Sequence, residues 1–368
     1  MSTVRIKKCK SYSEGDIKES FNELIAGFDK EKIYGKKIII FFDFPQPDIE
    51  ILKRVIEFLK ENGATKISAG TSIFIKDLPE SIQTLFKNEK IKFIDFRKDN
   101  YEKTDVSLRK TPNLEHFRGF AILSPVQYAT EKAITKMETP SIRTLKSVFL
   151  PASFSENDYV VAITKMKDSP LAKLGGFVNS MTSLITTKTR AEIFVNAMQN
   201  KQHESLLEIF SLMKNKVLFG VVDGVKASIS NNKEINQMKV LLFSDDLLSL
   251  DSVTSVLIGF RSNEIETNRL GDIFGFGSGT FNHITLYGDD FVEIRKEATK
   301  MLRYSKVFGK RNQPIPKITK EDKLKINKSM DFCPTGAIIE KEGFYLIDKN
   351  KCIKCYFCVE IAGDVFKL

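Results

Sequence analysis

The stretch Lys37-Ile-Ile-Ile-Phe-Phe-Asp-Phe44 is the strongest fold signal in this chain. It is a nearly continuous apolar run of about one strand's length, which is typical of a strand buried on both faces of a sheet. Residues 48–62 then show the periodicity of an amphipathic helix, and Gly63 follows where helices commonly end. A further strand is predicted at Lys66–Ala69. A strand, a helix and a second strand in close succession predict a parallel β-α-β unit.

The same alternation extends over most of the chain. Other strands are predicted at residues 4–8, 91–96, 119–124, 159–166, 217–222, 238–243 and 283–287. Other helices are predicted at residues 13–28, 247–260 and 291–304, and at residues 191–213 with an interruption near Asn200. Strands separated by helices favour an α/β fold with a mainly parallel sheet covered by helices. Since 368 residues are too many for one ordinary domain, we expect an α/β domain over residues 1–305 and a small α+β domain over residues 321–368.

Residues 306–320 have the composition of a linker, with two prolines, one glycine and several basic side chains. Positive charge is concentrated from Lys306 to Lys328, where eight Lys and Arg residues against Glu321 and Asp322 give +6 of the formal net charge of +10. Two interpretations are open for this segment. It is either a solvated linker or a docking surface for an acidic partner.

Four of the five cysteines lie near the C-terminal end of the sequence, namely Cys333, Cys352, Cys355 and Cys358. The last three follow one another with two residues between neighbours, and the first is remote and precedes a proline. Thiolates spaced in this way can hold three corners of a cubane cluster, while the remote cysteine closes the fourth. We therefore expect these four cysteines to bind one [4Fe–4S] cluster. A zinc site is the alternative, although zinc usually takes two separated cysteine pairs.

The residues between these cysteines, 339–348, predict a hairpin that turns at Glu342-Gly343. Such a hairpin would bring Cys333 beside the other three cysteines. Cys9 is not needed for the cluster, and we interpret it as a half-buried strand thiol.

About the last 48 residues resemble bacterial-type ferredoxins, in which each half supplies three close cysteines and a Cys-Pro that ligates the other half's cluster. The second half here keeps its three close cysteines, and the first half keeps only Cys333-Pro334. The positions that would hold the second cluster are instead Lys323, Ile326, Ser329 and Ala362. This matched loss indicates one cluster and not two.

Residues 1–305 resemble the DUF362 family, a domain of unknown function often fused to ferredoxin modules. The resemblance lies in the order of several segments: Val4–Tyr12, Lys37–Phe41, Leu59–Thr65, Val160–Lys167, Val221–Gly224, Ser244–Asp246 with Asp251, and Gly275–Gly277. Three departures from the family's usual pattern stand out. Phe41-Phe42-Asp43 replaces Lys-Pro-Asn, Ser169 stands in place of a His, and Asn179-Ser180 replaces a Lys-Asn pair. The resemblance implies the fold, and the departures imply that polar site residues typical of the family are partly lost.

Asp43, Asp223 and Asp246 each lie at the end of a predicted strand, where open α/β sheets place ligand-binding groups. They are the candidate catalytic residues, and together they could bind a metal, a sugar or an amine. The alternative for each is turn or helix N-cap chemistry, for which Asp is favoured. Lys165 and Lys167 could steer an anionic substrate or could be solvated. The sequence contains no dinucleotide-binding fingerprint and no recognisable catalytic triad.

These features predict an iron–sulfur protein that transfers electrons to or from a small-molecule redox site in the α/β domain or a partner enzyme. Whether the α/β domain is itself an oxidoreductase is open. An acidic ferredoxin or a redox enzyme is the expected partner. The alternative is a non-catalytic binding or sensing protein whose basic linker contacts an acidic protein or, less in keeping with the balanced charge elsewhere, nucleic acid. Because no apolar run has the length of a membrane span and the first residues lack a signal-peptide core, we expect a soluble cytoplasmic protein.

Overall fold

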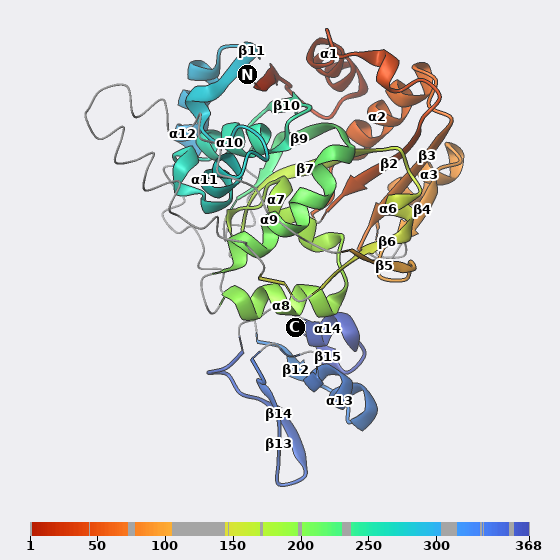
Figure 1. Cartoon of the computed structure of the whole chain (residues 1–368), viewed down its shortest axis with the longest axis vertical. Helices are drawn as coiled ribbons and strands as arrows, with labels where there is room; N and C mark the ends of the chain where they lie inside the picture. Colours follow the sequence, from red (N-terminus) through yellow and green to blue (C-terminus); the bar gives the residue numbers. More distant parts are fainter. Residues whose placement is uncertain are drawn as a thin grey trace, which may run out of the picture.

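A nine-stranded sheet forms the centre of the molecule, as the computed structural model in Figure 1 shows. The structure describes residues 2–43, 45–72, 78–104, 144–145, 147–169, 172–197, 201–229, 237–302, 315–331, 333, 335–352 and 357–367. The strands of the central sheet are β1 (Ser2–Lys8), β2 (Lys37–Phe42), β3 (Lys66–Thr71), β4 (Lys92–Asp95), β7 (Tyr159–Ser169), β8 (Lys173–Leu174), β9 (Val217–Ser228), β10 (Val240–Ser244) and β11 (Ile284–Gly288).

The strand order across this sheet is β11-β1-β10-β9-β7-β2-β3-β4, and β8 pairs with β7. The five strands from β9 to β4 are mutually parallel, and β1 is parallel to β11. On this path β10 is the strand that runs in the opposite direction, because it pairs antiparallel with both β1 and β9. The prediction of an α/β fold with a mainly parallel sheet is therefore confirmed.

Helices cover both faces of the sheet (Figure 1). One face packs against α1 (Glu14–Leu24), α2 (Ile49–Glu61) and α3 (Glu80–Asn88). The other packs against α7 (Phe177–Ser180), α8 (Thr187–Ala197), α9 (Gln202–Met213), α10 (Leu247–Leu257), α11 (Glu266–Ile273) and α12 (Phe291–Leu302). In β2, Ile38 and Ile40 face the first group, whereas Ile39 and Phe41 face the second. Burial on both faces explains why this strand is apolar at nearly every position.

The remaining elements of the large part of the chain are short. A two-stranded sheet pairs β5 (Tyr101–Thr104) with β6 (Val148–Pro151), and α6 (Ala152–Ser155) follows it. The predicted helix over residues 191–213 is two helices, α8 and α9. The strand predicted at residues 119–124 lies outside the described residues. Within the described residues, no helix has both the length and the apolar character that crossing a membrane requires.

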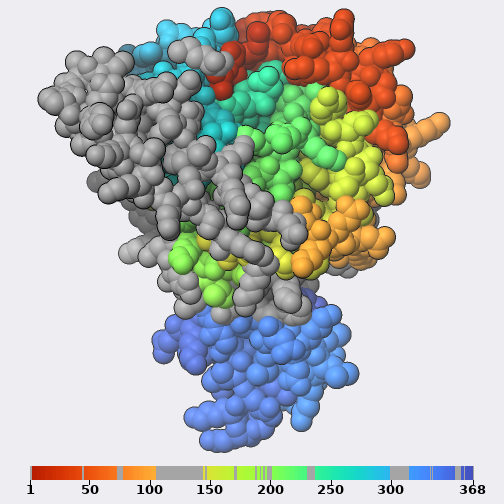
Figure 2. Space-filling model, viewed as in Figure 1, coloured from red at the N-terminus to blue at the C-terminus, as the bar shows by residue number. Residues whose placement is uncertain are grey.

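The described residues between 315 and 367 form six short elements. Figure 2 shows this part of the chain in blue, projecting from the rest. They are β12 (Lys317–Ile318), α13 (Lys323–Asp331), β13 (Ile338–Lys341), β14 (Phe344–Ile347), α14 (Phe357–Ile361) and β15 (Phe366–Lys367). They share an apolar core of their own, which we call the C-terminal apolar core: Ile326, Ile338, Ala362, Val365 and Phe366. These elements therefore do not depend on the cores of the large sheet for their packing.

The predicted hairpin is present in this region. Strands β13 and β14 pair antiparallel, with Lys341 opposite Phe344. Glu342 and Gly343 between them have φ angles of 54° and 83°, as a type I′ turn requires.

The C-terminal end of the predicted linker, residues 306–320, contains a short strand. Lys317 and Ile318 form β12, which pairs with β15, and the amide of Thr319 donates to the carbonyl of Val365. Residues 306–314 lie outside the described part of the chain.

A buried carboxyl group joins two helices on the face that carries α7. Asp251 of α10 accepts hydrogen bonds from the backbone amides of Phe177 (2.7 Å) and Val178 (3.0 Å), in the first turn of α7. Gly176 makes this approach possible, because a Cβ atom there would lie 2.1 Å from Asp251 Oδ1. Burial, the largest cause, raises the pKa of Asp251 from 3.8 to about 7.

This raised pKa predicts a specific dependence of stability on pH. Between pH 3.8 and about 7, the folded state keeps the Asp251 proton and the unfolded state loses it. The free energy of unfolding should therefore contain a contribution that is present below pH 4 and is lost as the pH rises through about 7. Asp251→Asn leaves one of the two amides of α7 without an acceptor, so we expect a loss of about 1–3 kcal/mol at pH 5. Urea unfolding from pH 5 to pH 8 should show a shallower decline for the variant; parallel profiles would contradict the assignment.

Candidate functional site

The C-terminal halves of β2, β7 and β9 share one edge of the sheet because the three strands are parallel. Asp43 follows β2 directly, Lys165 and Lys167 lie in β7, and Asp223 lies in β9. The structure therefore brings two of the three candidate carboxylates to the same edge. Asp223 does not end its strand, as predicted from the sequence, because β9 continues to Ser228.

Asp246 does not join this site. It follows β10, whose reversed direction places it at the opposite edge of the sheet. Its carboxylate caps α10 by accepting from the amides of Leu248 (3.0 Å) and Ser249 (3.1 Å), and it also accepts from the hydroxyl of Ser2 (2.6 Å). The N-cap alternative describes this residue, and its local hydrogen bonds account for the acidic side chain.

Asp223 is the centre of a hydrogen-bond network on the face that carries α1 and α2. Its carboxylate is fully buried and accepts from Lys165 Nζ (2.8 Å) and from the hydroxyl of Tyr12 (2.8 Å to Oδ1). It also accepts from the backbone amides of Asp48 and Val225, both at 3.2 Å. The carboxylate oxygens are thus occupied by donors from four places in the sequence, and Asp223 organises the site without itself lining the pocket beside it.

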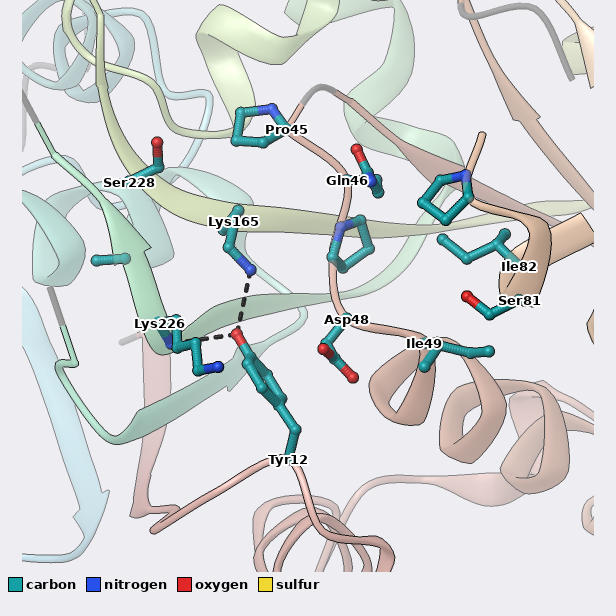
Figure 3. Close-up of a pocket in the computed structure, with 13 residues that line it drawn as sticks. Tyr12, Pro45, Gln46, Asp48, Ile49, Ser81, Ile82, Lys165, Lys226 and Ser228 are labelled. Carbon is teal, nitrogen blue, oxygen red and sulfur yellow. Dashed lines mark hydrogen bonds between the residues drawn. The ribbon is translucent and has the colours of Figure 1, made fainter. Parts of the chain in front are cut away.

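Tyr12 is held by this network as a neutral phenol. Its hydroxyl donates to Asp223, and its oxygen accepts from Lys165 Nζ and from the backbone amide of Lys226, both at 3.1 Å (Figure 3). Burial first, and then the charge of Asp223, raise the pKa of Tyr12 far above its usual range. Tyr12 is a positioning residue for Lys165, because its proton already has an acceptor. Lys165 has three N–H donors, and Asp223 and Tyr12 take two of them.

A pocket of about 470 Å³ opens beside this network (Figure 3). Tyr12, Lys165 and Lys226 lie on one side of it. The opposite side contains Ile49 at the start of α2 and Ile82 in the first turn of α3, with several prolines and the polar side chains of Gln46 and Ser81. A pocket of this volume at the edge of a parallel sheet is typical of a small-molecule site.

A second charged network lies beneath α7. Asp43 forms an ion pair with Lys167 and accepts hydrogen bonds from Ser180 (2.6 Å) and Thr164 (3.1 Å). All four residues are at most 6% exposed. The interpretation of Lys167 as a solvated lysine is therefore wrong, and the network is a closed one that presents no group to solvent.

The departures from the usual DUF362 pattern gather around this second network. Asp43 and Ser180 belong to it directly. Ser169 and Asn179 lie next to it in β7 and α7, and the Ser169 hydroxyl donates to Asn179 Oδ1 at 3.2 Å. Residues that are far apart in the sequence thus differ from the pattern at one place in the structure.

The hairpin of β13 and β14 lies between Cys333 and Cys352 in the sequence. Cys333 Sγ accepts from the amide of Ala337 at 3.2 Å. The carbonyl of Ala337 accepts from the amide of Asp348 (2.7 Å), and the carbonyl of Asp348 accepts from the amide of Cys352 (3.0 Å). A short chain of hydrogen bonds therefore joins the Cys333 and Cys352 loops. Cys333 and Cys358 also pack against the C-terminal apolar core.

The position of Cys355 lies outside the described residues. Among the side chains that the structure describes, no three His, Cys, Asp or Glu residues are grouped as a metal site. Cys9 is buried in the core between the sheet and α1, and its thiol donates to the carbonyl of Ser11.

A family model and a solved structure match this chain. A solved structure, the lactate racemase apoprotein from Thermoanaerobacterium thermosaccharolyticum, is similar with a TM-score of 0.43 and 12% sequence identity, and the match covers 70% of this chain and 57% of that one. No curated protein matches the sequence. The family model for the domain of unknown function DUF362 matches residues 45–255, which include Lys165 and Asp223 and end before the C-terminal cysteines. This match spans more than half of the sequence, and the chain therefore belongs to the DUF362 family.

Proposed function

We propose that this chain is an iron–sulfur protein that exchanges single electrons with an acidic protein carrier, through one [4Fe–4S] cluster. The ligands would be Cys333, Cys352, Cys355 and Cys358. Electrons would pass to or from a small molecule in the α/β part of the chain or a partner enzyme. A bound cluster of this kind supplies one-electron transfer, and its surroundings set the potential.

The observation that carries this proposal is the environment of Cys333. The amide of Ala337 donates a hydrogen bond to the sulfur at 3.2 Å, and hydrogen bonds from backbone N–H groups to ligand sulfurs are a common feature of iron–sulfur sites. The hairpin and the Ala337–Asp348 hydrogen bond then connect this loop to the loop that contains Cys352. Both features suit a remote fourth ligand that closes a cluster held by a close triplet.

The packing of α13 and α14 supports one cluster and not two. Ile326 and Ala362 stand where a second iron–sulfur cluster would need cysteines. Both belong to the C-terminal apolar core, with exposed fractions of 0% and 2%. Ser329, at a third such position, is 1% exposed and donates to the carbonyl of Lys325. These buried side chains therefore occupy positions where the ligands of a second iron–sulfur cluster would lie.

The basic surface around α13 suits an acidic carrier. Lys317, Lys320 and Lys323 are exposed and close in sequence to the proposed cluster domain. Lys325 differs from them, because its Nζ lies 2.6 Å from Asp364 and 3.5 Å from Asp322. The first three lysines can therefore be changed without removing an ion pair that joins described elements.

The electron-transfer proposal predicts a rate that depends on salt. Exposed charges attract an acidic carrier only within about 10 Å at 0.1 M ionic strength, so reduction of the cluster by an acidic ferredoxin should slow as salt rises. The triple variant with Lys317, Lys320 and Lys323 changed to Gln should be reduced about tenfold more slowly at low salt, with unchanged thermal stability. Stopped-flow absorbance of the cluster measures this rate.

A matched variant with Lys18, Lys32 and Lys87 changed to Gln alters the net charge equally on exposed residues of the large part of the chain. It should be reduced at nearly the rate of the unchanged protein. Equal rates for all three proteins at every salt concentration would contradict docking at the basic surface. Salt-dependent binding of RNA or DNA by a chain whose cluster cannot be reduced would instead support a binding or sensing function.

A further inference from the structure

We infer that the pocket beside Tyr12 binds a small monocarboxylate with an apolar body, whose carboxylate contacts Lys165 and Lys226. This inference concerns the large part of the chain and does not depend on the iron–sulfur cluster.

The two lysines supply hydrogen-bond donors that the protein itself does not use. Lys226 is exposed at the pocket, and no ion pair joins it to any residue that the structure describes. Its Nζ lies 5.5 Å from the centre of the Tyr12 ring, and Lys165 Nζ lies 5.4 Å from the same centre. Both ammonium groups therefore lie within 5.5 Å of the centre of the Tyr12 ring, and Lys165 retains one N–H for a ligand.

The acidic groups around the pocket make a cationic ligand a poorer fit. Asp223 accepts from Tyr12, Lys165 and two backbone amides, and it does not line the pocket. Asp48 caps α2 by accepting from the amide of Glu50 at 3.1 Å. Asp223 already accepts from four donors and offers little to an incoming ammonium group, while the positive charges of Lys165 and Lys226 act on Asp48, which lines the pocket.

The balance of charge favours a single negative charge on the ligand. Lys165 and Lys226 face Asp223 and Asp48, so the four groups together carry no excess positive charge when both acids are ionised. Burial, the largest cause, raises the pKa of Asp48, and the charge of Asp223 raises it further. With no excess positive charge among the four groups, a monoanion suits the site better than a dianion such as a phosphate ester.

The opposite wall gives the ligand its apolar requirement. Pro47 and Ile82 are buried beside the pocket, and Pro45, Pro79 and Ile49 complete the wall. Figure 3 shows Ile49 and Ile82 across the pocket from Lys165 and Lys226. A ligand whose carboxylate meets the lysines would place its hydrocarbon part against this wall, and burial of apolar surface there contributes to affinity.

The inference can be tested by calorimetric titration of the full-length chain with benzoate and hexanoate. Each carboxylate should saturate one site per chain, with a Kd at least tenfold lower than that of its neutral amide, benzamide or hexanamide. Lys226→Gln should raise the Kd of both carboxylates about tenfold, because it removes the charge that contacts them. Lys226 is exposed, so this variant should fold normally; Lys32→Gln, which removes an exposed lysine elsewhere, should leave both Kd values unchanged.

Four results would overturn the inference. Amides that bind as tightly as carboxylates would show that the lysines do not recognise the ligand. Tighter binding of phenyl phosphate than of benzoate would show that the pocket prefers a dianion. If neither carboxylate shows saturable binding, the pocket is not a carboxylate-binding site. An unchanged Kd in Lys226→Gln would show that Lys226 does not contact the carboxylate.

Discussion

Replacing Lys167 with Met should lower the free energy of unfolding by about 3–5 kcal/mol, the largest stability effect that we expect from a single substitution here. The substitution leaves Asp43 buried at 3% exposure without its cationic partner. Ser180 and Thr164 would still donate to the carboxylate, but two hydroxyl groups cannot replace an ammonium group in a region closed to water. Urea unfolding of the full-length chain measures the change.

A double variant separates the unpaired charge from the lost packing. Asp43→Leu combined with Lys167→Met removes both charges, and Ser180 keeps the carbonyl of Gly176 as an acceptor at 2.8 Å. We expect the double variant to recover most of the stability that Lys167→Met loses, because apolar pairs of similar volume often replace buried ion pairs at little cost. If the double variant is as unstable as the single one, the ion pair is not the reason for the loss.

The second large effect concerns the cluster. After anaerobic reconstitution the chain should contain about four iron and four sulfide per molecule. Cys333→Ala should reduce the iron content to less than about one per chain, since a cubane cluster that loses one of four thiolates is poorly retained. Cys355→Ala should have the same effect, although the two cysteines are far apart in the sequence. Iron analysis and visible absorbance measure both variants.

Cys9→Ala is the matched control for these variants. Cys9 is buried between the sheet and α1, so its loss should leave the iron content unchanged. A chain that binds one zinc and no iron after the same treatment would contradict the proposed cluster. So would a Cys333→Ala variant that retains four iron atoms.

The α/β fold could be predicted because its signals are local. The apolar run of β2 and the periodicity of α2 lie in neighbouring residues, and each reports burial of one element. The direction of β10 could not be predicted in this way. Its five buried residues would look the same in either direction, so nothing in them indicates that Asp246 lies at the other edge of the sheet.

The candidate site was less accessible to sequence reasoning for a related reason. Asp43 and Asp223 were identified because Asp at a strand end is a recognisable pattern. Tyr12 was missed, since its role depends on a contact with Asp223, 211 positions later in the sequence. For Lys167 the sequence left two interpretations open, a lysine that steers an anionic substrate or a solvated one, and its burial follows only from the position of Asp43. The cysteines were found because their spacing is itself the signal.

The place of β1 in the sheet has a consequence for how the nascent chain folds. This strand leaves the ribosome before the other described strands of the central sheet, yet Lys8 pairs with Val240 and Ser2 pairs with Ile284. Until those residues are synthesised, β1 and the free edge of β9 have no partners in the central sheet, and unpaired strand edges favour aggregation. Long-range pairings of this kind also slow folding, because a large loop must close before any contact forms. Chaperone binding should therefore be strongest while β10 and β11 are still being made, and it should decline once residue 288 has emerged.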